Sequence, residues 1–242
     1  MSKTRNAAPE KVCIVVWLLI ELALLIVIES IVNLDLKHSR LLNDVQYAAI
    51  VCNSIVTYLF FRAYGTKPEN TGEELMACGL FVTVAADFFM TFLSTGNTDP
   101  IYNIGVLLFC VVQLIYMRYI RPDKKMIVTD VVLIALFCSI FAHVEFLKLD
   151  LTNLLRICDV VLVLVNAIWA NLFRKDRLSR FFRVGIALFF LCDMTIGVRG
   201  AVPAGILHDD IALLVWLFYV PAQVCLTLSY VRSLEKGEAK AD

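Results

Sequence analysis

The sequence predicts an all-α, polytopic membrane protein with eight transmembrane helices. Of its 242 residues, 60% are hydrophobic and only 18% are charged, and the mean hydropathy is +0.78. A soluble domain is usually about 45–50% apolar and about 25% charged. Apolar runs of membrane length recur from one end of the chain to the other, and a hydrocarbon core about 30 Å thick needs about 20 such residues per helix.

The apolar runs are continuous rather than alternating, which favours helices over a membrane β-barrel. The first run is too long for the core of a signal peptide, so we expect a retained helix. Little sequence is left between the runs, which predicts a single transmembrane helical domain over residues 1–242. The expected spans are about 13–33, 45–64, 75–95, 101–120, 126–145, 151–173, 181–200 and 211–232.

Positive charges separate the loops into two classes. Alternate loops, counted from the N-terminus, carry 17 of the 22 Lys and Arg residues, and Arg156 lies just inside a span. The intervening loops carry only Lys37, Arg40, Lys148 and Arg199. Because cytoplasmic loops are enriched in Lys and Arg, the chain should be a multi-pass protein with both termini in the cytoplasm and an even number of spans.

Neither a metal nor a cofactor is predicted. Each of the eight cysteines falls in a different expected span and none forms a CxxC pair, so the spacing does not favour a metal site. The formal net charge of zero gives no case for a nucleic-acid partner. The oligomeric state is left open.

Two carboxylates lie in the middle of expected spans. Asp87 occurs in FVTVAADFFM (81–90) and Asp193 in FFLCDMTIGV (189–198). Such a charge costs at least about 2.5–3.5 kcal/mol in a helix centre. Both lie roughly 18–20 Å along their helices from the cytoplasmic end. If these helices are neighbours, the two carboxylates can share one site.

Other polar residues inside the spans have simpler interpretations. Arg156 and Asp159 are three residues apart on one helical face, which predicts a mutual ion pair. Asp130 can reach the cytoplasmic interface, and Glu21 is central enough for either a packing or a proton-carrying role. Glu29, His143 and Glu145 lie near the outer ends of their spans.

An internal repeat relates the third and fourth spans to the seventh and eighth. A glycine precedes each aspartate by eight residues, and the next span in each half carries a buried glutamine with a nearby tyrosine. Paired halves of membrane proteins often place polar groups where the repeats meet. The corresponding residues are Gly79, Asp87, Gln113 and Tyr116 in one half and Gly185, Asp193, Gln223 and Tyr219 in the other.

Four stretches in this order resemble the YhhN family, whose best-known members are lysoplasmalogenases. They are GLFVTVAADFFM (79–90), IGVLLFCVVQLIYMRY (104–119), RVGIALFFLCDMTIGV (183–198) and VWLFYVPAQVCLTLS (215–229). Three positions depart from the family pattern. Ala86 stands where the family usually has Gly, Cys192 where it has Ser, and Gln113 where it often has His.

The resemblance implies hydrolysis of the vinyl ether bond of a lysophospholipid that reaches the site from the bilayer. Asp87 and Asp193 would be the catalytic carboxyls, because protonation of the vinyl ether needs an acid and the resulting oxocarbenium ion needs a carboxylate. Burial and mutual repulsion keep at least one of two neighbouring carboxyls protonated, which leaves the other to act as the carboxylate. The same division of roles occurs in glycoside hydrolysis. Gln113, Tyr116, Tyr219 and Gln223 would bind substrate or orient water, and Arg199 is a weaker candidate for contact with phosphate.

Two other interpretations fit the same residues. A small transporter or lipid-binding membrane protein could use the aspartate pair for proton coupling. Both aspartates could also serve only as hydrogen-bonding partners between helices. The placement of Asp87 and Asp193 in the folded chain, facing one site or separate contacts, discriminates the functional interpretations from the structural one.

Overall fold

All regular secondary structure in the described residues is helical. The computed structural model describes residues 7–33, 40–64, 71–94, 99–121, 139, 151–173, 178–201 and 206–238. The helices are α1 Ala7–Asn33, α2 Arg40–Tyr64, α3 Thr71–Asp87, α4 Pro100–Ile120, α6 Leu151–Ile168, α7 Arg180–Ala201 and α8 Ile206–Glu238, with two short π-helical segments, η1 Phe88–Leu93 and η2 Trp169–Phe173.

Seven helices of this part of the chain are long and apolar enough to cross a membrane. Their bounds follow the predicted spans closely: the third runs over Gly72–Leu93 and the last over Leu213–Leu234. The fifth predicted span, 126–145, lies outside the described residues, as do Asp130, His143 and Glu145. The described residues therefore confirm a helical, multi-pass membrane protein, whereas the total of eight spans stays a prediction.

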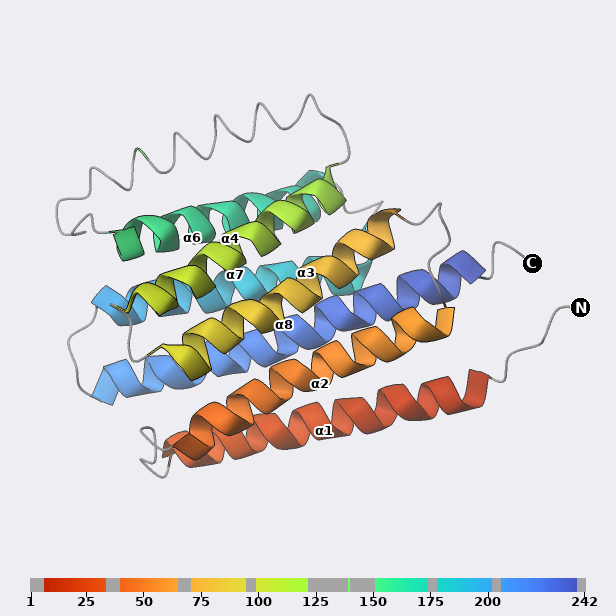
Figure 1. Cartoon of the computed structure of the whole chain (residues 1–242), viewed down its shortest axis with the longest axis horizontal. Helices are drawn as coiled ribbons and strands as arrows, with labels where there is room; N and C mark the ends of the chain where they lie inside the picture. Colours follow the sequence, from red (N-terminus) through yellow and green to blue (C-terminus); the bar gives the residue numbers. More distant parts are fainter. Residues whose placement is uncertain are drawn as a thin grey trace, which may run out of the picture.

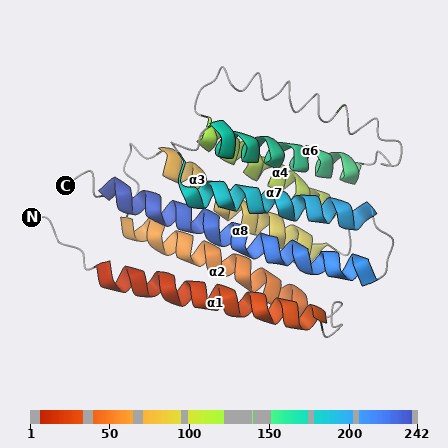
Figure 2. The same cartoon turned by 180° about the vertical axis from the view of Figure 1, so that it is seen from behind.

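The helices lie side by side with their axes nearly parallel or antiparallel (Figure 1). Helix α8 packs against α1, α2, α3 and α7, and the pairs α7–α8 and α3–α4 make the most extensive contacts. Helix α1 begins and α8 ends at the same end of the bundle, as both views show (Figures 1 and 2). Helix α4 ends, and α6 begins, at opposite ends. A chain that begins and ends at the same end of the bundle crosses it an even number of times, which agrees with the prediction.

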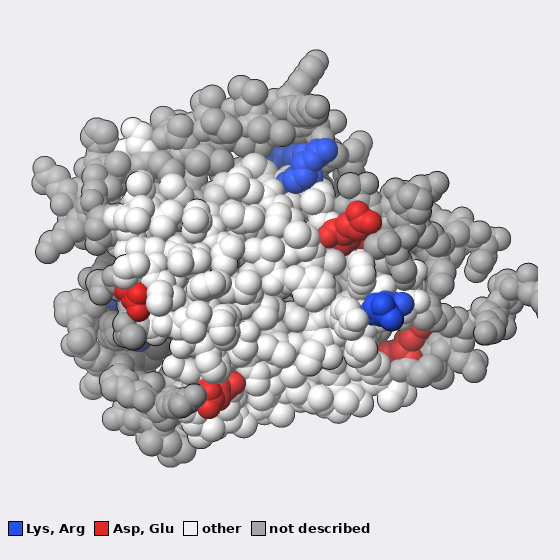
Figure 3. Space-filling model, viewed as in Figure 1, with Lys and Arg blue, Asp and Glu red and all other residues white. Residues whose placement is uncertain are grey.

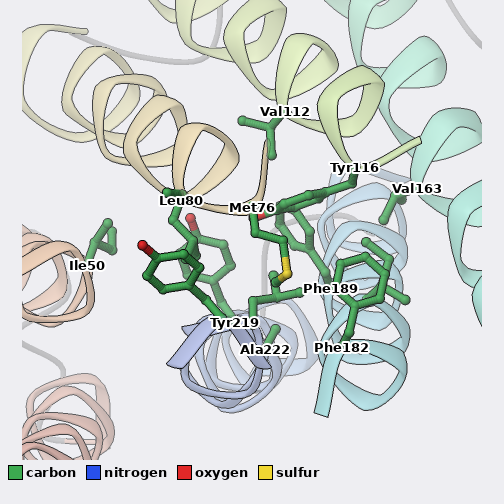
Figure 4. Packing of buried hydrophobic residues seen from close by; sticks show 14 of the residues in the cluster. Ile50, Met76, Leu80, Val112, Tyr116, Val163, Phe182, Phe189, Tyr219 and Ala222 are labelled. Atoms are coloured by element: carbon green, nitrogen blue, oxygen red, sulfur yellow. The ribbon is translucent and has the colours of Figure 1, made fainter. Parts of the chain in front are cut away.

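The apolar surface and the core are both typical of a membrane bundle. On the face seen in Figure 3, charged side chains of the described residues lie toward the two ends, and a broad uncharged band separates them. Of the seven membrane-length helices in the described residues, α1 is the most peripheral, because it has the smallest buried share, 17%. The main core forms where side chains from α2, α3, α4, α6, α7 and α8 converge (Figure 4).

Glycines bring α3 close to α4 and α7 close to α8. A Cβ atom at Gly79 would lie 2.5 Å from Cε1 of Tyr116, and one at Gly185 would lie 2.9 Å from Cγ of Leu226. Tyr116 follows Gln113 on α4 by three positions, and Leu226 follows Gln223 on α8 by the same number. The two pairs therefore pack at matching positions, which supports the predicted repeat without establishing it.

Candidate functional site

Asp87 lies where α3 changes from α-helical to π-helical geometry. It is the last residue of α3, and η1 follows directly with an Ser94 N–H to Phe89 C=O hydrogen bond of 3.0 Å across five residues. Single π-turns inside helices occur often at functional sites, because the wider turn re-aims nearby side chains. The hydrophobic pattern does not reveal this irregularity, since the run remains apolar through it.

The carboxylate of Asp87 is held by a tyrosine from α8. The Tyr219 hydroxyl donates a short hydrogen bond to Oδ2 of Asp87, and both side chains are buried. Tyr47 of α2 also lies within electrostatic range of this carboxylate. A hydroxyl that donates to a carboxylate stabilises its ionised form. Sequence reasoning included Tyr219, through both the internal repeat and the family resemblance, but missed Tyr47, which no motif marks.

Asp193 of α7 lies within electrostatic range of two other buried aspartates, Asp87 and Asp159. These three residues are the carboxylate cluster, and their side chains are 6–8% exposed. Oδ2 of Asp193 and Oδ1 of Asp159 are buried and have no hydrogen-bond partner in the part of the chain that the structure describes. Helices α3 and α7 have no extensive contact with one another, and α8 packs against both. Buried polar atoms without a protein partner call for an explanation, and a ligand group or water is one.

Aromatic rings surround Tyr219. Its ring centroid lies 5.5 Å from Trp216, 5.8 Å from Phe189 and 6.5 Å from Phe109. Phe189 precedes Asp193 by one helical turn, so the rings border the carboxylate cluster. The faces of aromatic rings attract cations. The site therefore combines carboxylates with an apolar, electron-rich wall.

The two glutamines of the predicted site are both buried. Nδ2 of Asn166 on α6 donates to the Gln113 carbonyl oxygen at 2.8 Å and to its Oε1 at 3.2 Å. Nε2 of Gln113 and Nε2 of Gln223 have no hydrogen-bond partner among the described residues. Each glutamine thus keeps amide donors that can meet a substrate oxygen or water. Asn166, which orients Gln113, was missed because a lone Asn in an apolar run carries no pattern.

Tyr116 lies farther from the carboxylate cluster than the sequence suggests. Its ring packs against Gly79 and stands 5.9 Å from Phe182. Gly79 precedes Asp87 by eight residues, which is about 12 Å along a helix. Tyr116 is completely buried in the core, so this position favours packing, and its contact with substrate stays a prediction.

The predicted ion pair between Arg156 and Asp159 does not form. Neither residue has an ion pair with any residue that the structure describes, and the Arg156 guanidinium lies 5.0 Å from the ring centroid of Tyr102 on α4. Helical side chains lean toward the N-terminus of their helix. Arg156 therefore extends toward the start of α6, whereas Asp159 remains one turn deeper in the cluster.

Glu21 belongs to a separate polar contact between α1 and α2. Its Oε1 accepts hydrogen bonds from Nε1 of Trp17 at 3.1 Å and Nδ2 of Asn53 at 2.9 Å, and the residue is buried. The described residues contain no group of three His, Cys, Asp or Glu side chains placed to hold a metal ion.

The model of one known protein family matches most of the chain. The model of the YhhN family matches residues 47–230, from within α2 to near the end of α8. This chain belongs to the YhhN family. The matched region contains all three aspartates of the carboxylate cluster as well as Tyr219, and α1 with Glu21 precedes it. No curated protein and no solved structure matches the chain significantly.

Proposed function

We propose that this YhhN family member is a membrane-embedded hydrolase of the lysoplasmalogenase type, which cleaves the vinyl ether bond of a lysophospholipid. The observation that carries the proposal is the contact of Tyr219 with Asp87 beside Asp193, whose Oδ2 has no partner. Membership of a family that includes lysoplasmalogenases supports the same activity. The lipid would enter from the bilayer, and the site residues would act without a cofactor.

The two carboxyls take different roles in this mechanism. Asp193, protonated, delivers its proton to the vinyl carbon distal to the ether oxygen, which converts the bonded carbon and oxygen into an oxocarbenium ion. Asp87 is the carboxylate, because Tyr219 donates to it. The Asp87 carboxylate stabilises the oxocarbenium ion and accepts a proton from the water that adds to that ion. General acid–base catalysis of this kind contributes about 10²–10⁴-fold.

The hemiacetal formed by water then collapses. The hemiacetal hydroxyl gives its proton to Asp193, the bond between the former vinyl carbon and the glycerol oxygen breaks, and that oxygen takes the proton held by Asp87. A fatty aldehyde and a glycerophospho-headgroup leave, and both carboxyls are back in their starting states. One water is consumed and no electrons are exchanged. The rings of Phe109, Phe189 and Trp216 around Tyr219 would stabilise the cationic intermediate through their faces. Free amide groups of Gln113 and Gln223 would orient the water.

Substitution of the two aspartates tests the proposal. Purified wild-type protein should release aldehyde from a lysoplasmalogen, and Asp87→Asn or Asp193→Asn should lower kcat by at least about 100-fold while the Tm changes little. Glu21→Gln is the matched control, because Glu21 is an equally buried carboxyl outside the carboxylate cluster.

Two outcomes would count against hydrolysis at this site. Undiminished turnover in both aspartate variants would remove the pair from the mechanism. Lipid or proton flux in reconstituted vesicles, without any aldehyde formed, would instead favour a transporter that uses the same carboxyls.

A further inference from the structure

Two arginines near one end of the bundle each have an Nε donor without an acceptor among the described residues. Nε of Arg156 on α6 and Nε of Arg199 on α7 are buried and make no hydrogen bond. No carboxylate of the described residues forms an ion pair with either side chain. A guanidinium is always charged and presents a rigid fork of donors that matches a phosphate or carboxylate. Each side chain therefore keeps at least one buried donor that an anion could satisfy.

The two arginines lie on the same side of the carboxylate cluster. Helix α6 begins and α7 ends at the end of the bundle away from the chain termini (Figures 1 and 2), and the two helices pack against each other. Arg156 precedes Asp159 by three residues, and Arg199 follows Cys192 by seven. Both spacings keep a residue on nearly the same face of its helix.

The faces of α6 and α7 that carry Arg156 and Arg199 are the ones that meet at the carboxylate cluster. The Cys192 thiol lies within electrostatic range of Asp193, Asp87 and Asp159. Arg156 is then about 5 Å along α6 from Asp159, and Arg199 is about 10 Å along α7 from Cys192. The arginines thus stand between the carboxylates and the end of the bundle, at the depth expected for a lipid headgroup.

Arg156 is held in place by an aromatic ring. Its guanidinium stacks over Tyr102 of α4 at 5.0 Å, which leaves the donor edge of the planar group available. The side chain is only half-buried, so an anion that approaches from the headgroup region can reach it. Helix α4 packs against α6 and thereby supplies this support.

We propose that Arg156 and Arg199 bind the phosphate of a lysophospholipid whose vinyl ether lies at the carboxylate cluster. This inference rests on the proposed hydrolase function and names the residues that would bind the phosphate of its substrate. The phosphate sits on the two arginines, and the glycerol carries the ether bond one to two helical turns deeper. Recognition of the phosphate makes the site selective for phosphate-bearing lipids over neutral 1-alkenylglycerols. The shared chemistry is an anionic phosphate group, which inorganic phosphate also offers.

Kinetics on two substrates test this assignment. With a 1-alkenyl-glycerophospho lipid, Arg156→Gln and Arg199→Gln should each raise KM by about 10-fold or more and leave kcat nearly unchanged, as expected for loss of a charge-assisted contact to substrate. With 1-alkenylglycerol, which has no phosphate, the same variants should match the wild type. Arg232→Gln is the control, because this guanidinium also stacks on a ring, that of Phe181 at 4.6 Å, but lies near the other end of the bundle.

Direct binding separates failure of this inference from failure of the proposed reaction. The probe is a non-hydrolysable 1-alkyl-ether lysophospholipid, bound to wild-type protein in detergent. Binding that is lost in both arginine variants supports the phosphate site even if neither substrate is turned over. Equal binding by wild type and variants, or an equal loss of activity on both substrates, overturns it. Stabilisation by inorganic phosphate, dependent on both arginines and without lipid binding, would assign the site to free phosphate and overturn the lipid assignment.

Discussion

At the scale of single residues, the contact between Tyr219 and Asp87 carries the most information. A carboxylate in an apolar bundle is costly unless a donor or a ligand compensates it. Tyr219 donates to Asp87 from another helix, whereas Oδ2 of Asp193 has no such partner. The two aspartates looked equivalent in sequence, with matching depth and matching glycines. Their hydrogen-bond partners distinguish them.

Removing the Tyr219 hydroxyl should impair the proposed reaction without unfolding the chain. We expect Tyr219→Phe to lower kcat for lysoplasmalogen by about 10-fold or more, because a hydrogen bond to a charged group contributes about 1.5–3 kcal/mol. Aldehyde release by the purified variant measures this. Tyr230→Phe is the control: Tyr230 is also buried on α8 but lies about 16 Å farther along it. Equal loss in both variants would contradict a specific role for Tyr219.

Asp159 shows why residue spacing alone can mislead. A separation of three residues puts Arg156 and Asp159 on one face and suggests a pair. The direction in which helical side chains lean then separates their charged ends. The consequence is a third carboxylate beside Asp193, a position that spacing within α6 could not reveal. The contact depends on α7, so only the packing of the two helices shows it.

At the scale of helices, close approach at glycines determines how the pairs pack. A Cβ atom at Gly105 on α4 would lie 2.3 Å from Cγ of Met90 and 2.8 Å from the Ala86 carbonyl oxygen. The Ala86 carbonyl oxygen belongs to the backbone and cannot move aside without disturbing its helix. Ala86 itself is fully buried, so this departure from the family pattern is accommodated next to Asp87.

Enlarging Gly105 should therefore destabilise the protein. We expect Gly105→Ala to lower the free energy of unfolding by about 1–3 kcal/mol through overpacking, seen as a fall in Tm of at least about 2 °C in detergent. Gly197→Ala is the matched control, because no heavy atom lies within 4 Å of a Cβ there. A comparable loss of stability in both variants would contradict the proposed close contact.

At the scale of the whole molecule, the helix arrangement and the charge distribution agree. Helix α1 begins and α8 ends at one end of the bundle (Figure 1). The loops with 17 of the 22 positive charges are assigned by the alternation of spans to that same side. The positive-inside rule predicts that this is the cytoplasmic side.

The predicted orientation can be measured in cells. A tag at either terminus should be accessible only after permeabilisation, because both termini are expected in the cytoplasm. A tag inserted in the connection 94–100, between η1 and α4, should be accessible in intact cells. Accessibility of only one terminus in intact cells would require an odd number of spans and would overturn the eight-span topology.

The sequence by itself determined the membrane character, the bounds of seven described helices and the two aspartates that stand out in them. It could do so because insertion into lipid depends on apolar length and on the cost of isolated charges, both of which are local properties. Tertiary structure alone decided the third carboxylate, the partner of Asp87, the π-turn that follows it and the unpaired state of Arg156. These depend on which helices are neighbours and how their side chains meet, and no local pattern encodes that.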